Sequence, residues 1–374
     1  MTPIFQIMFD IEGTMKELIL EKLDLLIDSF QSILYEEDEH FIKNMKEKNI
    51  VGDDVARYMY WEWTQGIGLY GLWKLFEKTQ ENKYIKMIEK YFNICFELGL
   101  PAKNINTVAP MLTLAKYAIY TNNENYKVVC EKWASYIFKD MKKTRFGGLQ
   151  HLTSDSINDE ELWDDSLFMS VLFLAYWGKS TKNNDYIEEA NYQFLLHSYY
   201  LSNHKNGLWY HGWTFKENNN FVDAFWGRGN CWITSAIPEF LELNISSKSE
   251  KRFLEMILVR QIESLIKYQN SNGMWHTLID DKTSYLEASA TCGFAYGMLK
   301  ARNINLISRE YANCIEKALN SVLLNIDDNG ILQNVSYGTP MGRNSKDFYK
   351  EIPIKPMPYG QALAILLLVE KLGS

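Results

Sequence analysis

The feature that most constrains this chain is an alternation of two kinds of helical segment, repeated roughly every 60 residues. One kind is apolar on nearly every face, as in DSLFMSVLFLAYWG (165–178), which predicts a helix surrounded by protein. The other carries an apolar stripe opposite charged residues, as in EKRFLEMILVRQIESLIKYQ (250–269), which predicts a helix with one solvent-facing side. The alternation therefore predicts paired inner and outer helices.

Segments that open an apolar helix begin near residues 63, 106, 163, 226, 285 and 358. The loops between pairs form a second series, GGLQH, NGLWYHG, NGMWHTL and NGILQNV, whose glycines suit turns with positive φ. Repeats of this kind are typical of stacked supersecondary units. We expect an all-α fold, an (α/α)6 barrel of six helical hairpins closed into a toroid. An irregular helical fold is the alternative, and no break in composition divides residues 1–374 into more than one domain.

The stretch GIGLYG (66–71) matches the dinucleotide-binding pattern GxGxxG. That pattern binds a dinucleotide only within a βαβ unit, where a strand precedes it. Here it follows YMYWEWTQ, and no alternation of strands and helices surrounds it. We therefore expect these glycines to allow close packing at the start of an inner helix.

Composition narrows the class of partner. The net charge of −8 argues against nucleic acid or an anionic membrane as the main partner. No stretch reaches the roughly 18 apolar residues of a membrane span, and Asp10 and Glu12 interrupt the apolar run that a signal peptide needs. The five cysteines show no metal-binding spacing, which suits a reducing cytoplasm. We expect a cytoplasmic protein, a monomer or weak homodimer, without a metal or organic cofactor.

The residues that could carry chemistry fall where inner helices begin or in the loops that join them. They are Trp61, Trp63, Asn106, His151, Asp164, Asp165, His211, Trp213, Trp226, Arg228, Trp232, His276 and Glu287. Indole faces cover the apolar faces of sugar rings, and polar groups beside them bind hydroxyls. Core packing is the alternative for each tryptophan, but their setting beside Gly, His and Arg favours a sugar-binding surface.

Two adjacent carboxylates, Asp164 and Asp165, stand at the start of an apolar helix. One of them is expected to cap the helix by accepting backbone N–H bonds. The other can enter the cavity as a general acid and base, and Asp165 is better placed because it lies closer to the helix. Capping lowers a carboxyl pKa whereas desolvation raises it, and the sequence does not decide between them.

Three histidines and one arginine complete the polar set. His151, His211 and His276 each follow a loop glycine by a few residues, and they lack the spacing of metal ligands, which favours hydrogen bonds to substrate. Arg228, in FWGRGNCW, carries a fork of donors that matches a carboxylate in two parallel bonds. A sugar site with a fixed positive charge suits a uronic acid, and a structural salt bridge is the alternative for Arg228.

The segments WDDSLFMSVLFLAYWG, NGLWYHGW, FWGRGNCW and GMWHTLIDDKTSYLEASA resemble the unsaturated rhamnogalacturonyl hydrolases of glycoside hydrolase family 105. They occur in the family's order, and the resemblance extends over roughly residues 55–370. It implies the same (α/α)6 barrel, with Asp165 as the general acid and base. It also implies that His151 lies near the catalytic aspartate.

The resemblance further implies that His211 and Trp213 line the sugar subsite and that Arg228 lies between Trp226 and Trp232 near the uronate. One departure is Asn106, because some members carry a second aspartate there. Asn106 cannot exchange a proton, although it can still hydrogen-bond a sugar.

The implied reaction removes a terminal 4,5-unsaturated uronic acid from oligosaccharides made by polysaccharide lyases, such as rhamnogalacturonan disaccharide. Asp165 would protonate C4 while water adds at C5, so one carboxyl serves both steps, unlike the carboxylate pair of ordinary glycosidases. Three alternatives stay open. They are a related hydrolase of unsaturated glucuronyl units, a sugar epimerase on the same toroid, and a non-catalytic sugar-binding protein.

Overall fold

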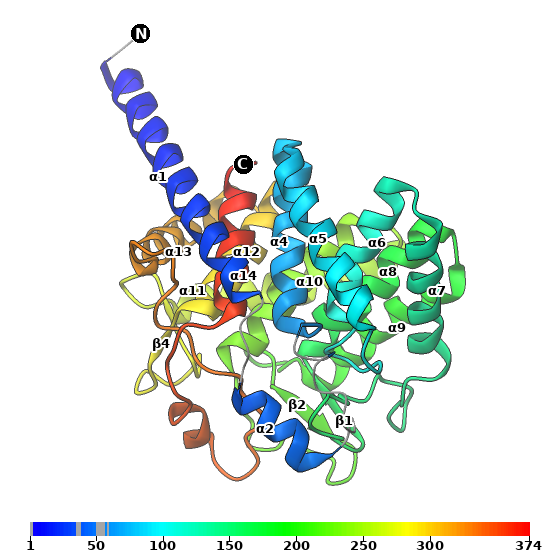
Figure 1. Cartoon of the computed structure of the whole chain (residues 1–374). Helices are drawn as coiled ribbons and strands as arrows, with labels where there is room; N and C mark the ends of the chain where they lie inside the picture. The colour runs from blue at the N-terminus through cyan, green and yellow to red at the C-terminus, as the bar shows by residue number, and fades with distance from the viewer. Residues whose placement is uncertain (1–2, 35–38, 50–56, 58–59) are drawn as a thin grey trace.

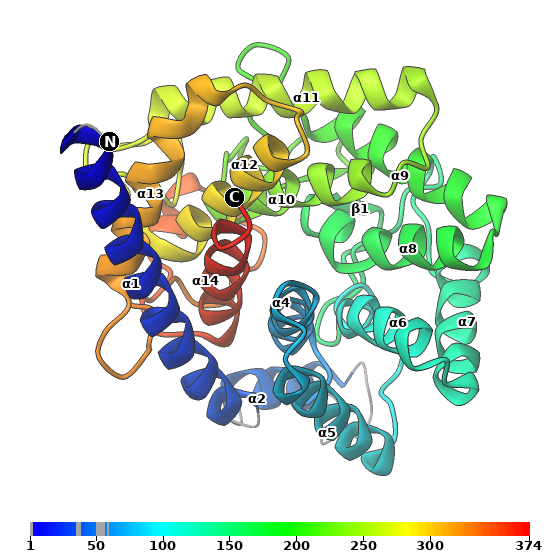
Figure 2. The same ribbon diagram turned by 90° about the horizontal axis from the view of Figure 1, so that it is seen from above.

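The computed structural model describes residues 3–34, 39–49, 57 and 60–374, and its helices form two concentric rings (Figure 2). The inner ring consists of α4 (Trp63–Thr79), α6 (Ala109–Thr121), α8 (Leu172–Thr181), α10 (Gly227–Glu242), α12 (Ala288–Asn303) and α14 (Pro358–Lys371). The outer ring consists of α1 (Pro3–Ile33), α5 (Asn82–Leu98), α7 (Glu124–Lys139), α9 (Asn184–Leu201), α11 (Lys248–Tyr268) and α13 (Ala312–Asn325).

The inner ring is closed, because each inner helix packs against the next and α14 returns to pack against α4. This arrangement confirms the predicted (α/α)6 barrel. The sixth pair differs from the expected hairpin, since α14 packs against α1 from the other end of the chain (Figures 1 and 2). Gln361 of α14 donates to the Ser29 hydroxyl of α1 at 2.8 Å, and that hydroxyl donates to the carbonyl of Gly330, also at 2.8 Å.

Burial follows the two kinds of sequence pattern. Nearly every residue of α12 and α14 is buried, as the uniformly apolar segments predict. The outer helix α11 buries one stripe, which includes Leu254, Ile257, Leu258, Ile262 and Leu265. An inner helix has neighbours on all sides, so a polar residue there must find a partner within the protein.

Glycines permit the close contacts of this packing. Gly66, Gly68 and Gly71 all lie within α4, and a Cβ on Gly66 would stand 2.6 Å from the backbone nitrogen of Pro110 in α6. The GxGxxG pattern is therefore a packing feature of an inner helix, as predicted. The loop glycines also adopt the positive φ that was expected of them, namely Gly147, Gly207, Gly273 and Gly330.

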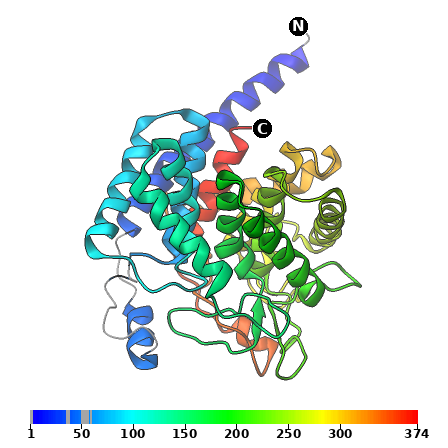
Figure 3. The same cartoon turned by 90° about the vertical axis from the view of Figure 1, so that its right-hand side faces the viewer.

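The loops at one end of the barrel carry two small antiparallel sheets. Strand β1 (Glu161–Trp163) pairs with β2 (Gly212–Thr214), and β3 (Trp275–His276) pairs with β4 (Leu286–Glu287). The helix α2 (Glu39–Lys48) lies beyond the barrel at the same end (Figures 1 and 3). Short 3₁₀ turns occupy Arg309–Tyr311 and Lys346–Lys350. Across the described residues, no helix combines the length and the apolar character needed to cross a membrane.

Candidate active site

A cavity of about 690 Å³ lies at the end of the barrel where the inner helices begin. Six of the predicted site residues line it, namely Trp63, Asn106, His151, Asp165, Trp226 and Arg228. Asp165 and Arg228, which are far apart in the sequence, therefore open into one cavity. The remaining wall comes from α2, from the loop 153–158 and from the segment 337–359.

Asp165 is positioned by the two elements on either side of it. Strand β1 ends at Trp163, and the third inner helix begins with a π-helical turn at Leu167–Val171 before it continues as α8. Such turns are rare and occur mostly at functional sites, because the extra residue redirects the side chains beside it. The side chain of Asp165 retains 17% exposure and lines the cavity.

Two histidines surround the carboxylate of Asp165. His211 Nε2 lies 3.7 Å from Asp165 Oδ2, and its Nδ1 is 2.7 Å from the hydroxyl of Tyr349. His151 stacks on Trp163 with ring centroids 4.3 Å apart, and its Nδ1 is 3.0 Å from the Ser166 hydroxyl. Burial lowers the pKa of His211, and it lowers the pKa of His151 to about 4.

The pKa values of the neighbouring carboxyls Asp164 and Asp165 are shifted in opposite directions. Burial opposes ionisation of Asp165, but contact with His211 and the charges of His211 and His151 lower its pKa to about 2. Burial and the charge of Asp165 raise the pKa of Asp164 well above its usual value. In the free protein the proton of the pair therefore resides on Asp164, and Asp165 is ionised. Groups pushed apart in this way are typical of acid–base sites.

Asp164 is completely buried. Its carboxyl contacts the Asp165 carboxyl and the backbone N–H groups of Asp164 and Asp165, and these contacts act on its pKa. The oxygens pack against Gly229, where a Cβ would stand 2.4 Å from Oδ2. Asp164 thus lies behind Asp165, next to the N–H groups where the helix begins.

Asp164, Asp165 and His211 offer three ligand atoms that lie within 4.8 Å of one another. Carboxylate and imidazole are ligands that divalent transition metals accept, so this set fits such an ion by donor type. The hydrogen bond between His211 Nδ1 and the Tyr349 hydroxyl resembles the outer support that metal-binding histidines have. The same three groups also form a proton-sharing cluster, and proton transfer requires only the groups already present.

Arg228 is engaged more fully than the sequence predicts. Its Nη1 donates to the carbonyl and hydroxyl of Ser336, and its Nη2 donates to the Tyr337 carbonyl at 3.0 Å and the Thr339 hydroxyl at 2.8 Å. The guanidinium lies between the rings of Trp226 and Tyr359, 4.7 Å from each centroid. Arg228 thus holds the cavity-lining loop 336–339 with these donors, and its expected contact with a ligand carboxylate stays a prediction.

Several predicted tryptophans lie outside the cavity lining. Trp61 packs against Phe92 and Trp133, and its indole N–H donates to the Thr107 carbonyl at 2.8 Å. Trp232 is fully buried beneath the cavity, in contact with Trp63. These two tryptophans belong to the hydrophobic core.

Trp213 lies on β2 and packs against Tyr200 at 5.2 Å, away from the cavity. The aromatic pattern alone could not separate such tryptophans from those that line the site.

The remaining predicted residues also do not line the cavity. His211 supports Asp165 from within the protein and does not line the cavity. His276 is buried in β3, with Nδ1 2.5 Å from the Ser284 carbonyl. Glu287 caps α12 by accepting the N–H of Ala290 at 2.5 Å, and its Oε1 lies 3.8 Å from Arg228. The salt-bridge alternative for Arg228 is thus realised.

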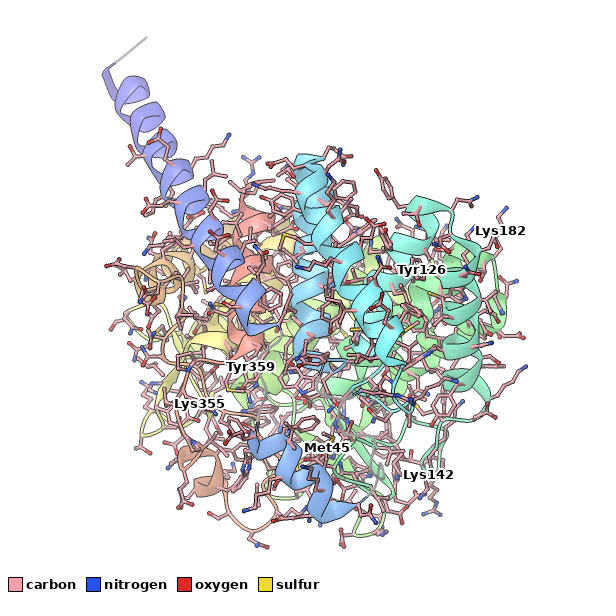
Figure 4. The ribbon with its side chains drawn as sticks, in the orientation of Figure 1. Met45, Tyr126, Lys142, Lys182, Lys355 and Tyr359 are labelled. Atoms are coloured by element: carbon pink, nitrogen blue, oxygen red, sulfur yellow. The ribbon has the colours of Figure 1, made fainter. Side chains whose placement is uncertain are left out.

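The structure adds lining residues that the sequence analysis missed. Glu62 precedes the first inner helix, and Tyr359 opens the sixth, where its ring stacks on Trp63 at 4.6 Å. Lys355 also lines the cavity, and Figure 4 shows Lys355 and Tyr359 at the end of the barrel that faces α2. A signal was present, because both Glu62 and Tyr359 lie beside the repeated segments that open inner helices.

Comparison with known proteins agrees with this geometry. The family model described as Glycosyl Hydrolase Family 88 matches residues 35–373. An unsaturated rhamnogalacturonyl hydrolase, YesR of Bacillus subtilis, is 29% identical over 317 residues, which cover 84% of this chain and 90% of that protein.

Two solved structures are similar over most of both chains. One, a possible member of the GH105 family from Klebsiella pneumoniae, is 40% identical with a TM-score of 0.87, over 94% of this chain and 93% of that chain. The other, a possible GH105 member from Salmonella enterica, is 42% identical with the same TM-score and coverage. The resemblance found in the motifs is thus confirmed, and the chain belongs to the group of glycosidases formed by glycosyl hydrolase families 88 and 105.

Proposed function

We propose that the protein removes a terminal 4,5-unsaturated uronic acid from short oligosaccharides produced by lyases, with rhamnogalacturonan disaccharide as the first substrate to test. The observation that carries the proposal is the opening of Asp165 into the same cavity as the loop held by Arg228. The name of the B. subtilis relative supports this choice of substrate. We keep the chain as one catalytic domain and the cytoplasm as its place of action, on the grounds given by the sequence.

The proposed reaction begins at the double bond rather than at the glycosidic oxygen. Asp165 donates its proton to C4, water adds to C5, and the proton of that water returns to Asp165. The hemiketal at C5 then opens by breaking the bond between C5 and the ring oxygen. The hemiacetal left at C1 expels the second sugar as an alcohol. A single carboxyl therefore acts as acid and then as base.

The low pKa of Asp165 in the free protein is compatible with this role. A bound uronate brings a second negative charge into the cavity and excludes water, and both effects favour the protonated form of a carboxyl. Binding of the substrate therefore raises the pKa of Asp165, and its buried neighbour Asp164 already carries a proton. Protonation of the acid is thereby coupled to the arrival of the anionic substrate.

Recognition of the uronate carboxylate falls to the side of the cavity formed by residues 337–359. Thr339 and Gly338 line the cavity on the loop that Arg228 holds, and Lys355 contributes an ammonium group 4.5 Å from the ring of Tyr337. Polar groups of a fixed loop and a nearby cation are a common way to bind a carboxylate. In this proposal Arg228 acts by positioning the loop and by its charge.

The decisive variant is Asp165→Asn, which preserves shape but removes the exchangeable proton. We expect kcat to fall by about 10³-fold or more while substrate still binds, because general acid and base catalysis are lost together. The ultraviolet absorbance of the conjugated double bond gives the rate, and calorimetry gives the binding. Asp159→Asn is the matched control, since Asp159 is an exposed carboxylate paired with Lys142 and Lys216. Retention of full activity by Asp165→Asn would contradict the proposal.

The same assay separates the alternatives. A hydrolase of unsaturated glucuronyl units would prefer disaccharides of glycosaminoglycan type over the pectin-derived one. An epimerase would leave the alkene absorbance unchanged. A sugar-binding protein would give calorimetric binding without turnover of any unsaturated disaccharide. Asn106 is the residue that favours this alternative, because an asparagine cannot exchange a proton.

A further inference from the structure

Glu62 is an acidic residue in the cavity for which the proposed reaction has no use. It is 4% exposed, it lines the cavity, and it occupies the position before α4. Burial raises its pKa to about 8, against the opposing effect of its hydrogen bonds with Ser154 and Trp63. The carboxyl is therefore uncharged near neutral pH, and an uncharged carboxyl both donates and accepts hydrogen bonds.

The protein uses only part of the hydrogen-bonding capacity of the Glu62 carboxyl. Oε1 accepts the hydroxyl of Ser154, whose oxygen in turn accepts the amide N–H of Asn104 at 3.0 Å. Oε2 has one longer contact, 3.3 Å from the backbone nitrogen of Trp63. Both oxygens therefore accept hydrogen bonds from the protein, and Oε2, with the longer contact, keeps capacity for a hydrogen bond to a ligand in the cavity.

Asn106 supplies a second unused polar group on the same side. It lines the cavity just before α6, and its side-chain amide makes no hydrogen bond to any part of the chain that the structure describes. Glu62 and Asn106 stand at the first and second inner helices, and Asp165 stands at the third. A neutral wall with donors and acceptors therefore lies next to the proposed acid.

Charged residues of both signs lie close to this wall. The ring of Tyr359 contacts both Trp63, the residue after Glu62, and the guanidinium of Arg228, at 4.6 and 4.7 Å. Arg343 lies 3.4 Å from Asn158, in the loop that also carries Asp155. A sugar that contacts Glu62 therefore lies within the same cavity wall as the residues held by Arg228.

We propose, as a refinement that rests on the proposed function, that Glu62, beside Asn106, binds hydroxyl groups of the sugar substrate. Glu62 is thus a substrate-binding residue on the wall next to Asp165.

The first experiment compares Glu62→Ala with Glu62→Gln. We expect Glu62→Ala to raise KM about 10-fold with little change in kcat, because it removes a hydrogen bond made equally in the ground and transition states. Glu62→Gln keeps a donor and an acceptor, so its KM should rise only about 2- to 3-fold. Glu81→Gln is the matched control, since Glu81 occupies the same position before the outer helix α5 and is exposed. Wild-type KM in both Glu62 variants would overturn the assignment.

The pH dependence provides a readout that a purely structural role would not change. In the wild type KM should rise above about pH 8 as Glu62 ionises, and in Glu62→Gln this rise should disappear. The charged and titratable groups that share the cavity are Glu39, His40, His151, Asp155, Asp165, Arg228, Tyr337, Arg343, Lys355 and Tyr359. They are present in both proteins, so the difference between the two profiles isolates Glu62. Identical profiles would contradict the proposal even if Glu62→Ala fails to fold.

Failure of this proposal is distinguishable from failure of the proposed function. Unchanged KM values in the Glu62 variants would leave the hydrolase function intact. Consumption of no unsaturated disaccharide by the wild type would instead contradict the proposed function itself.

Discussion

At the scale of single residues, Arg228 shows that a motif can identify a cavity-lining side chain without revealing the bonds that hold it in place. An arginine between tryptophans in an acidic chain was expected to bind a ligand carboxylate, and it does line the cavity. Its donors nevertheless go to Ser336, Tyr337 and Thr339. These acceptors lie more than a hundred residues away, so no local pattern could reveal them.

We predict that Arg228→Lys destabilises the fold by about 3 kcal/mol and raises KM. A lysine cannot reproduce the planar set of bonds to the loop, and it leaves the buried Glu287 without its close charge partner. Thermal unfolding gives the stability, and the alkene assay gives KM. Arg343→Lys is the control, because Arg343 is about half exposed and pairs with Glu161 near the surface. Unchanged melting of Arg228→Lys would show that the bonds to the loop contribute little.

At the scale of elements, glycines set how closely the inner helices approach. A Cβ on Gly297 of α12 would stand 2.2 Å from the carbonyl oxygen of Thr234 in α10. Both groups belong to backbones of neighbouring inner helices, so neither can move alone. The same requirement applies to Gly66 of α4, which faces the backbone of α6, whereas Gly68 of α4 makes room for the ring of Phe30 in α1.

We predict that Gly297→Ala lowers the free energy of unfolding by about 1–3 kcal/mol, as overpacking does. Alanine favours the helix by about 1 kcal/mol, but the backbone clash outweighs this gain. Gly13→Ala is the matched control in α1, because no atom lies within 4 Å of the position of its Cβ. Denaturant midpoints should therefore shift in opposite directions for the two variants. A stabilised Gly297→Ala would show that α10 and α12 separate at little cost.

At the scale of the whole molecule, the closed ring buries titratable groups far from the cavity as well as within it. Glu239 accepts hydrogen bonds from Tyr70 and Tyr296 and lies 3.3 Å from Lys74. Burial opposes its ionisation, but Lys74 and Lys300 lower its pKa to about 2. His197, buried in α9, has its pKa lowered to about 4 by burial. The stability of the ring therefore depends on which of these buried groups are charged.

We predict that the stability contributed by neutral His151 and His197 is lost as the pH drops from about 6.5 to about 4. Folding lowers the pKa of both histidines, so below pH 6.5 the unfolded chain binds protons that the native protein does not. Each histidine contributes a slope of up to about 1.4 kcal/mol per pH unit within that window, while the raised pKa values of Glu62 and Asp164 act in the opposite direction. His197→Gln should therefore lose one histidine's contribution to the slope, whereas His204→Gln at an exposed position should not. Equal pH slopes of the free energy of unfolding in the wild type and His197→Gln would contradict the prediction.

The sequence by itself determined the helical ring. Inner helices are surrounded by protein, whereas outer helices have one side in water, and this difference appears in the pattern of apolar residues within each helix. It also located Asp165, Arg228 and the wall of the site, since repeats place equivalent positions at the same end of a barrel. Tertiary structure alone decided which tryptophans were core, which acceptors Arg228 binds and which of Asp164 and Asp165 holds the proton. Those outcomes depend on contacts between distant segments and on desolvation, and neither is written in the neighbouring residues. For the same reason Glu62, a single acid beside a repeat, became visible as a site residue only once the ring had closed around it.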